Sequence, residues 1–188
     1  MGHVIEHAPS GRARCRGCDA KIGKGELRFG ERRPNAFGEG EMTLWFHLPC
    51  AAYKRPEPFL AMLELLGGDP AGDLAAGDLR VARALRPDAE FGIAHRRVPR
   101  IDSVDRAPTG RARCRSCREL IEKDSWRIGL VFFEEHRFEP SGFIHASCAE
   151  AYFGTTDVLE RVHHFNPALD AKELHAIEAA LQPRASSD

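Results

Sequence analysis

The sequence lacks a long apolar segment, because no run of hydrophobic residues approaches the roughly 20 that are needed to span a bilayer. Its first residues also lack the basic and apolar regions of a signal peptide. We therefore expect no membrane segment and an intracellular protein. This would be the cytoplasm or nucleoid if the source is bacterial and the nucleus if it is eukaryotic.

Isolated cysteines are absent as well. All six cysteines of the 188-residue chain fall into two groups, each with the pattern Cys-x-x-Cys followed later by His-x-x-Cys. In a reducing compartment, metal ligation explains such clusters better than disulfide bonds do. A set of disulfides would also not require a histidine at the same place in both groups.

The chain as a whole has no large excess of positive or negative charge. The 27 basic and 28 acidic residues give a net charge of −1, which by itself argues against a nucleic-acid binder. The distribution is uneven, however: residues 9–55 hold ten basic and five acidic residues (net +5), whereas 108–153 hold seven of each. A local patch matters more than the sum. Arginine outnumbers lysine 22 to 5, which either genome composition or selection for phosphate contacts would explain.

An internal repeat sets the domain organisation. The segment Pro9–Cys18 recurs as Pro108–Cys117 with an offset of 99, and the match resumes at His47 and His145 with an offset of 98. We therefore predict a tandem duplication. The first module would cover 9–87 with its trailing helices, a polar linker 88–107, and the second module 108–183.

Local sequence patterns predict the elements within each copy. Strands are expected at 26–30 and 43–46, and again at 125–133 and 142–144. A helix should begin after each histidine, over about 48–53 and 146–153, and spaced leucines predict further helices behind each module. The expected fold class is small α+β, with two zinc-stabilised modules that each have a short antiparallel sheet and helices packed behind it.

The ligand set of each cluster suits zinc. Three thiolates and one imidazole complete a tetrahedral zinc site, so no open position remains to activate water, and we expect structural sites and no enzyme activity. Zinc binding of roughly 10–16 kcal/mol would stabilise modules too small for a large core. We predict two structural zinc ions per chain, ligated by Cys15, Cys18, His47, Cys50, Cys114, Cys117, His145 and Cys148.

The motif Gly-Arg-Ala-x-Cys-x-x-Cys resembles the PARP-type zinc finger. A strand arginine follows it, and 27–28 residues separate the second cysteine from His-x-x-Cys. Such fingers occur in poly(ADP-ribose) polymerases and in a nick-sealing eukaryotic DNA ligase. The resemblance covers about 9–66 and 108–181, and it implies sequence-independent binding of DNA nicks or strand ends, that is, DNA-damage recognition in repair.

The resemblance also implies DNA-contacting residues. Phosphate-binding arginines would be Arg12, Arg28, Arg111 and Arg127, and apolar side chains that stack on exposed base pairs would be Phe37, Met42 and Phe138. Arg14 and Arg113, which recur beside them in both copies, are further candidates for DNA contacts. For Phe37, a small core beneath its loop is the alternative. Because acidic residues crowd the second loop, we expect the first module to supply most of the DNA affinity.

The sequence departs from the family in lacking an ADP-ribosyltransferase domain and a Lys-x-Asp-Gly nucleotide-transfer motif. We therefore expect any catalysis to come from a separate repair enzyme. A different class of function stays open: a zinc-stabilised protein-interaction or regulatory module that does not bind DNA. The net charge and the acidic second loop favour that alternative.

Overall fold

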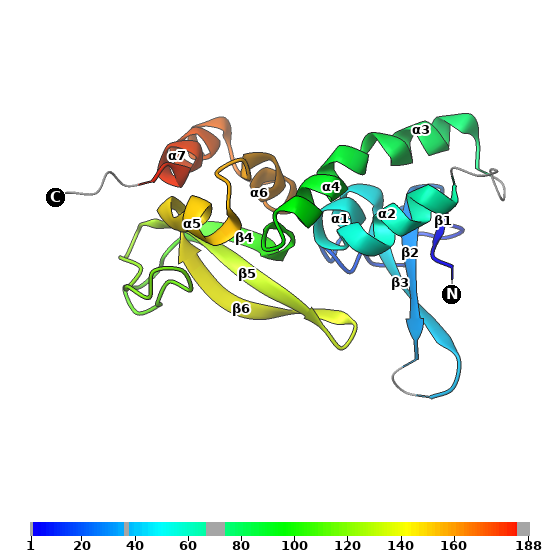
Figure 1. Ribbon diagram of the computed structural model, residues 1–188, viewed down its shortest axis with the longest axis horizontal. Helices are drawn as coiled ribbons and strands as arrows, with labels where there is room; N and C mark the ends of the chain where they lie inside the picture. Colours follow the sequence, from blue (N-terminus) through cyan, green and yellow to red (C-terminus); the bar gives the residue numbers. More distant parts are fainter. Residues whose placement is uncertain (1, 36–37, 67–73, 184–188) are drawn as a thin grey trace. The chain divides into compact units, whose positions relative to one another are not determined.

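The computed structural model describes residues 2–35, 38–66 and 74–183. The chain divides into two compact units: the first comprises residues 1–94 with 135–137, and the second comprises 95–134 with 138–188. Each unit contains one three-stranded antiparallel sheet and several helices (Figure 1). Among the described residues, no helix combines the length and the apolar character that a membrane crossing requires. The predicted small α+β class is confirmed.

The first unit begins with its sheet, whose strand order is β1-β2-β3. The three strands are β1 Val4–His7, β2 Leu27–Pro34 and β3 Glu41–His47. Four helices follow: α1 Leu48–Lys54, α2 Pro56–Leu65, α3 Ala76–Ala84 and α4 Arg86–Ala94. Proline near the first turn of α1 and α2 suits these helix starts, because its missing N–H would be unpaired there in any case.

The second unit repeats this plan with sheet order β4-β5-β6. Its elements are the 3₁₀ turn η1 Val98–Arg100, β4 Ile101–Arg106, β5 Trp126–Glu134, β6 Arg137–His145, the 3₁₀ turn η2 Ala146–Cys148, α5 Ala149–Phe153, α6 Leu159–Phe165 and α7 Ala171–Leu181. A capping box starts α7: the Glu173 amide donates to the Asp170 carboxylate, and the Asp170 amide donates to that of Glu173.

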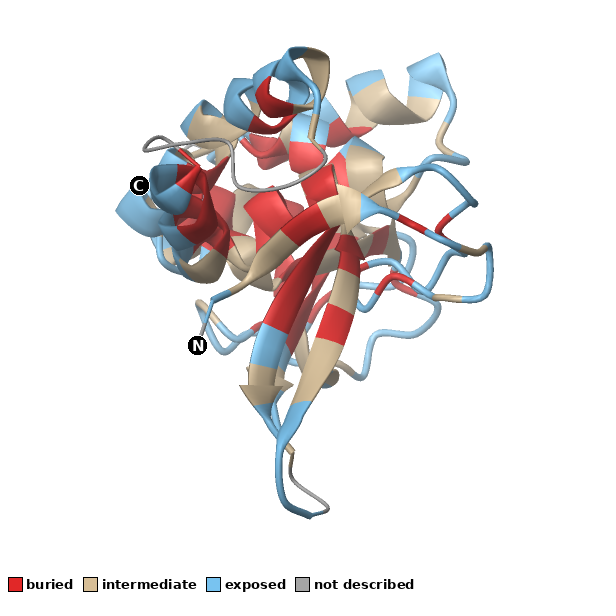
Figure 2. Ribbon diagram, turned by 90° about the vertical axis from the view of Figure 1, so that its right-hand side faces the viewer, coloured by how far each residue is buried: buried red, intermediate tan, exposed pale blue. Residues whose placement is uncertain are grey.

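The core of the first unit lies between its sheet and its helices. Phe29 on β2 packs against Phe46 on β3 and against Phe59 on α2, with ring centroids 6.3 and 5.6 Å apart, and all three side chains are fully buried. The strands are buried beside the helices and exposed towards the hairpin tip (Figure 2). The helices therefore hold in place the end of the sheet at which β3 ends with His47.

Two strands and part of the expected linker differ from the predictions. Sequence patterns did not identify β1 and β4, which are short outer strands of their sheets. The stretch 88–107 was expected to be a linker, but it contains most of α4, then η1 and β4, and is therefore largely regular structure. The helix predicted over 146–153 begins as the 3₁₀ turn η2.

Candidate metal centres and nucleic-acid interface

The first metal-ligand cluster joins a tight turn to the end of β3. Cys15 and Cys18 lie on the turn before β2, His47 ends β3, and Cys50 follows in α1. The backbone amides of Gly17 and His47 both donate to Cys15 Sγ at 3.3 Å and hold its side chain in place. A Cβ on Gly17 would lie 2.9 Å from that of Cys50, so the turn needs glycine to bring the thiols together.

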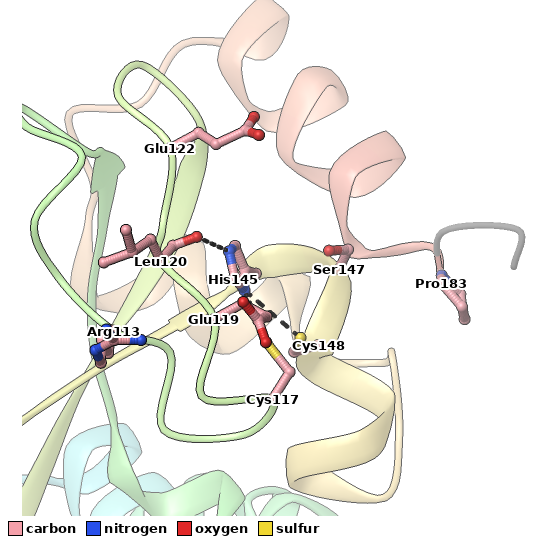
Figure 3. A pocket seen from close by; sticks show the side chains of 9 residues that line it. All are labelled: Arg113, Cys117, Glu119, Leu120, Glu122, His145, Ser147, Cys148 and Pro183. Atoms are coloured by element: carbon pink, nitrogen blue, oxygen red, sulfur yellow. Dashed lines mark hydrogen bonds between the residues drawn. The ribbon is translucent and has the colours of Figure 1, made fainter. Parts of the chain in front are cut away.

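The second cluster repeats this arrangement with Cys114, Cys117, His145 and Cys148. The amides of Ser116 and His145 donate to Cys114 Sγ at 3.4 Å. Figure 3 shows Cys117, His145 and Cys148 directed towards one another at a cavity of about 830 Å³. Acidic Glu119 and Glu122 also line this cavity.

The donor atoms fit a tetrahedral zinc ion. Zn–S and Zn–N bonds of about 2.3 and 2.0–2.1 Å in a tetrahedron place S and N about 3.6 Å apart. The Nδ1 atom of His47 lies 3.3 and 3.9 Å from the sulfurs of Cys18 and Cys50, and all four donors lie within 4.8 Å of one another. The corresponding distances at His145 are 3.5 and 3.7 Å. Each chain thus has two structural zinc sites, as predicted.

The second nitrogen of each histidine is also held in place. Nε2 of His47 lies 3.3 Å from the carbonyl oxygen of Lys21, and Nε2 of His145 lies 3.1 Å from that of Leu120. A proton on Nε2 donates to the carbonyl and leaves Nδ1 free as the metal ligand. The turn that carries the cysteines therefore also sets the histidine tautomer.

Crowding of the donors shifts their protonation when no metal is bound. Hydrogen bonding to Cys15 is the main cause that raises the pKa of His47 to about 10, and burial is the main cause that raises the pKa of Cys148 to about 12. A protonated imidazole or thiol cannot ligate zinc. Zinc binding must therefore release protons, and acid will favour loss of the metal.

A stacked arginine occupies the same place in both sheets. Arg28 on β2 lies between Glu6 on β1, which accepts from its Nε and Nη2 at 3.2 and 2.5 Å, and the ring of Trp45 on β3, 3.5 Å from the guanidinium carbon. Only 6% of the residue's surface is exposed. This ion pair and cation–π contact hold the three strands together through their side chains.

Arg127 is the equivalent residue of the second module and is 9% exposed. It donates from Nε and Nη2 to the two carboxylate oxygens of Asp105 at 2.8 Å and lies 3.7 Å from the Phe143 ring centre. Both strand arginines that were predicted to contact phosphate, Arg28 and Arg127, therefore already have a carboxylate partner. Their DNA-contacting role stays a prediction, and a phosphate would have to use their remaining N–H groups or displace the carboxylate.

The other predicted DNA contacts lie on or near the metal-binding turns. Arg12, Arg14, Arg111 and Arg113 are exposed. Arg14 donates to the carbonyl and carboxylate of Asp19 at 2.7 and 3.3 Å, whereas Arg113 donates to the Arg118 carbonyl at 3.2 Å. These arginines are accessible to a ligand.

The predicted apolar wedges are placed unequally. Phe37 lies outside the described residues. Met42 is half-buried on β3, opposite Arg33. Phe138 on β6 is half-buried and packs against Phe133, with ring centroids 5.0 Å apart, so part of its surface is used within the hairpin. The stacking roles stay predictions.

Sequence reasoning did not identify the carboxylates that hold the stacked arginines. A signal was present, because the repeat extends upstream of Pro9: Ile5, Glu6 and Ala8 match Val104, Asp105 and Ala107 at the same offset of 99. Glu6 pairs in register with Arg28, as Asp105 does with Arg127. The conserved spacing between the copies marks a structural pair.

Comparison with known proteins agrees with this geometry. Residues 6–61 match the family model described as the poly(ADP-ribose) polymerase and DNA-ligase Zn-finger region. The first module is a PARP-type zinc finger. The second module, with the same ligands, sheet and stacked arginine, repeats it, and we refer to the two modules as the first and second finger.

Several relatives extend the similarity over both fingers. A poly [ADP-ribose] polymerase of Sarcophaga peregrina is 27% identical over 142 residues, 69% of this chain and 14% of that protein. The polynucleotide 3′-phosphatase ZDP of Arabidopsis thaliana is 25% identical over 181 residues, 86% of this chain and 26% of that protein. Over a shorter region, poly [ADP-ribose] polymerase 1 of Caenorhabditis elegans is 42% identical over 50 residues, 27% of this chain and 5% of that protein. The chain thus spans about a quarter or less of the length of these relatives.

Proposed function

We propose that this chain binds DNA at nicks or strand ends without reading its sequence, and that it does so as a non-enzymatic recognition module. The observation that carries the proposal is the exposed arginine pair that each zinc-anchored turn presents, Arg12 with Arg14 and Arg111 with Arg113. Arginine contacts to phosphate position a protein on DNA without specifying the bases. The names of the relatives, which include a polynucleotide 3′-phosphatase, support nucleic-acid ends as the ligand.

Zinc contributes by fixing the turn. The four donors connect each turn to the end of a strand and the start of the following helical segment, so the ion holds the turn and its exposed arginines in place. With four protein donors, the ion has no open coordination position. The cavity beside the second cluster therefore gives access to the ligands and not to a metal-bound water, which is why we assign no catalytic role.

One observation favours the alternative, a protein-interaction or regulatory module. Arg28 and Arg127 are buried and paired with carboxylates, so the strand arginines that should contact phosphate are neutralised in the free chain. A module of this kind would keep its fold and zinc but would not respond to DNA. The two functions therefore predict opposite results in a binding experiment.

The deciding experiment compares nicked, blunt-ended and uninterrupted circular duplexes by fluorescence anisotropy at two salt concentrations. We expect tighter binding to the two broken substrates, with log affinity falling by about 0.9 per log of salt for each phosphate contacted. Arg12→Gln should weaken binding, whereas Arg80→Gln, an exposed arginine on α3, is the matched control. Lack of binding at low salt would favour the interaction module.

A further inference from the structure

The second finger contains a group of arginines that the proposed contacts do not use. Arg97 and Arg100 come from the segment before β4, and Arg115 and Arg118 come from the zinc-binding turn. Together with Phe132 on β5 and Tyr152 on α5 they line a cavity of about 240 Å³. We call this the arginine pocket.

Four of the side chains that line the pocket are positively charged. No carboxylate lines it, and none of its four arginines forms an ion pair with an acidic side chain in the described parts of the chain. Guanidinium groups crowded into one cavity repel one another, and this repulsion is relieved when an anion binds. The arrangement thus favours a ligand with several negatively charged oxygens.

Aromatic side chains hold two of the arginines in position without neutralising them. Arg100 lies 4.1 Å above the Phe132 ring and donates to the Tyr152 hydroxyl at 3.3 Å. Arg97 lies 4.8 Å from the Tyr152 ring centre and donates to the Tyr152 carbonyl at 3.3 Å. Their guanidinium groups are therefore oriented before a ligand arrives. Phe132 remains 46% exposed, although it is a large apolar side chain.

The other two arginines of the pocket, Arg115 and Arg118, lie on the zinc-binding turn, and two features of the backbone accommodate them. Gly142 on β6 has φ +93°, and a Cβ there would lie 2.8 Å from Arg115 Nε, so the glycine makes room for the Arg115 side chain. Arg118 has φ +70°. Aspartate adopts this left-handed conformation more readily than arginine does, and the first finger has Asp19 at the matching position.

The first finger lacks the pocket's charge pattern. Asp19 pairs with Arg14 there, whereas Arg118 reverses the sign of the charge at the same place. The positions that match Phe132 and Tyr152 hold Arg33, which lies 3.6 Å from the Glu31 carboxylate, and Lys54, which is buried. The arginine pocket is therefore specific to the second finger among the described residues.

The size and chemistry of the pocket favour a phosphate group. Small-molecule sites usually measure roughly 300–1,000 Å³, so this cavity is too small for a complete cofactor. The planar forks of several arginines match the tetrahedral oxygens of a phosphate, which accepts hydrogen bonds in several directions. A single carboxylate would satisfy fewer of them.

We propose that the arginine pocket binds a phosphate group of the DNA strand that the second finger engages. This inference rests on the proposed function, and it deepens it by adding a contact away from Arg111 and Arg127. It also changes the interpretation of the second finger's charge: basic and acidic residues balance in number over 108–153, but Arg115 and Arg118 of this stretch join Arg97 and Arg100 in one cavity. The backbone and a strand terminus both carry such a group, since each presents negatively charged phosphate oxygens to the arginines.

The test uses the full zinc-loaded chain with Arg97 and Arg118 both replaced by glutamine. Both side chains are exposed and form no ion pair with a described residue, so the fold should be retained, and circular dichroism checks this. The matched control, Arg80→Gln with Arg96→Gln, removes the same charge from exposed positions outside the pocket. For nicked DNA we expect about tenfold weaker binding by the pocket variant and a salt slope smaller by about 0.9, the value for one lost phosphate contact.

Two further experiments distinguish a terminal from a backbone phosphate, and the pocket assignment from the proposed DNA binding. Nicks with and without a 5′-phosphate distinguish a terminal group from the backbone, and a defect of the pocket variant on either substrate supports the proposal. Inorganic tripolyphosphate, followed by NMR of the arginine Nε–H groups, probes the pocket without DNA. If the wild-type chain binds nicked DNA but the pocket and control variants lose equal affinity, the pocket assignment fails while the proposed function stands. If the wild-type chain binds no DNA, both fail, even if tripolyphosphate shifts the pocket signals.

Discussion

Replacing Glu31 by alanine tests how much a buried ion pair contributes to the first finger. The Glu31 side chain on β2 is 1% exposed and accepts from Arg55 Nε and Nη2 at 2.7 and 2.6 Å, while Arg33 lies 3.6 Å away. Alanine would leave the Arg55 guanidinium, which is 17% exposed, without its bidentate partner. Breaking a buried pair in this way costs about 3–5 kcal/mol, and the partial exposure of Arg55 favours the lower end, about 3 kcal/mol.

The second finger provides the rescue variant. At the positions that match Glu31 and Arg55 it has Leu130 and Phe153, both buried. An apolar pair often replaces a buried ion pair without loss of stability. The double variant Glu31→Leu, Arg55→Phe should therefore regain most of what Glu31→Ala loses.

The assay is urea unfolding of the full zinc-loaded chain, followed by the fluorescence of Trp45 on β3 in a Trp126→Phe background. This background makes the signal specific to the first finger, because the chain has only two tryptophans. Glu90→Ala is the control: it removes an exposed i,i+4 partner of Arg86 and should cost less than about 0.5 kcal/mol. A loss below about 1 kcal/mol for Glu31→Ala, or a double variant as unstable as the single one, would refute the reasoning.

Three other predictions follow from the sites. Chelation of zinc should unfold both fingers, since each structural site contributes roughly 10–16 kcal/mol, and circular dichroism with and without added zinc checks this. The contact between His7 and Asp78 should stabilise the first unit at pH values between the lowered pKa of Asp78 and the raised pKa of His7. Above this range His7 loses its proton, and below it Asp78 gains one, so the stabilisation is lost on both sides. The main cause at His7 is a hydrogen bond to the Gly25 carbonyl, so Asp78→Asn should lower the His7 pKa in an NMR titration without returning it fully to its ordinary value. Arg28→Ala should weaken binding to nicked DNA about tenfold more than Arg127→Ala, after unfolding curves have shown equal occupancy of the folded state; equal losses of affinity would contradict the unequal fingers.

The sequence predicted the metal sites because their evidence is local. Cys-x-x-Cys and His-x-x-Cys each fix two donors within a few residues, and duplication shows that the pattern is not accidental. The strands and helices next to the ligands were also found, because alternation and leucine spacing mark them. Both kinds of signal come from residues that are only a few positions apart in the chain.

The stacked arginines could not be predicted in the same way because their partners are distant in the chain. Arg28 meets Glu6 across an antiparallel pair, 22 residues away, and β1 has only four residues. Such a short strand has too little alternation to stand out from a loop, and its pairing with β2 determines its structure. Comparing the two copies upstream of Pro9 would have revealed the pair, since the carboxylate keeps its offset from the arginine.

Comparison of the two fingers shows which positions can differ when the zinc ligands are kept. Metal binding supplies much of the folding free energy, so the ligands must stay while other positions can change. The buried ion pair at Glu31 corresponds to the apolar residue Leu130, and Asp19 on the zinc-binding turn corresponds to Arg118. The first exchange keeps a buried position buried. The second puts arginine in a left-handed conformation that aspartate adopts more easily, and no acidic side chain in the described part of the chain forms an ion pair with it. A residue that costs stability in the free finger is best explained by a ligand that the finger binds, which is why we assign the arginine pocket to a phosphate.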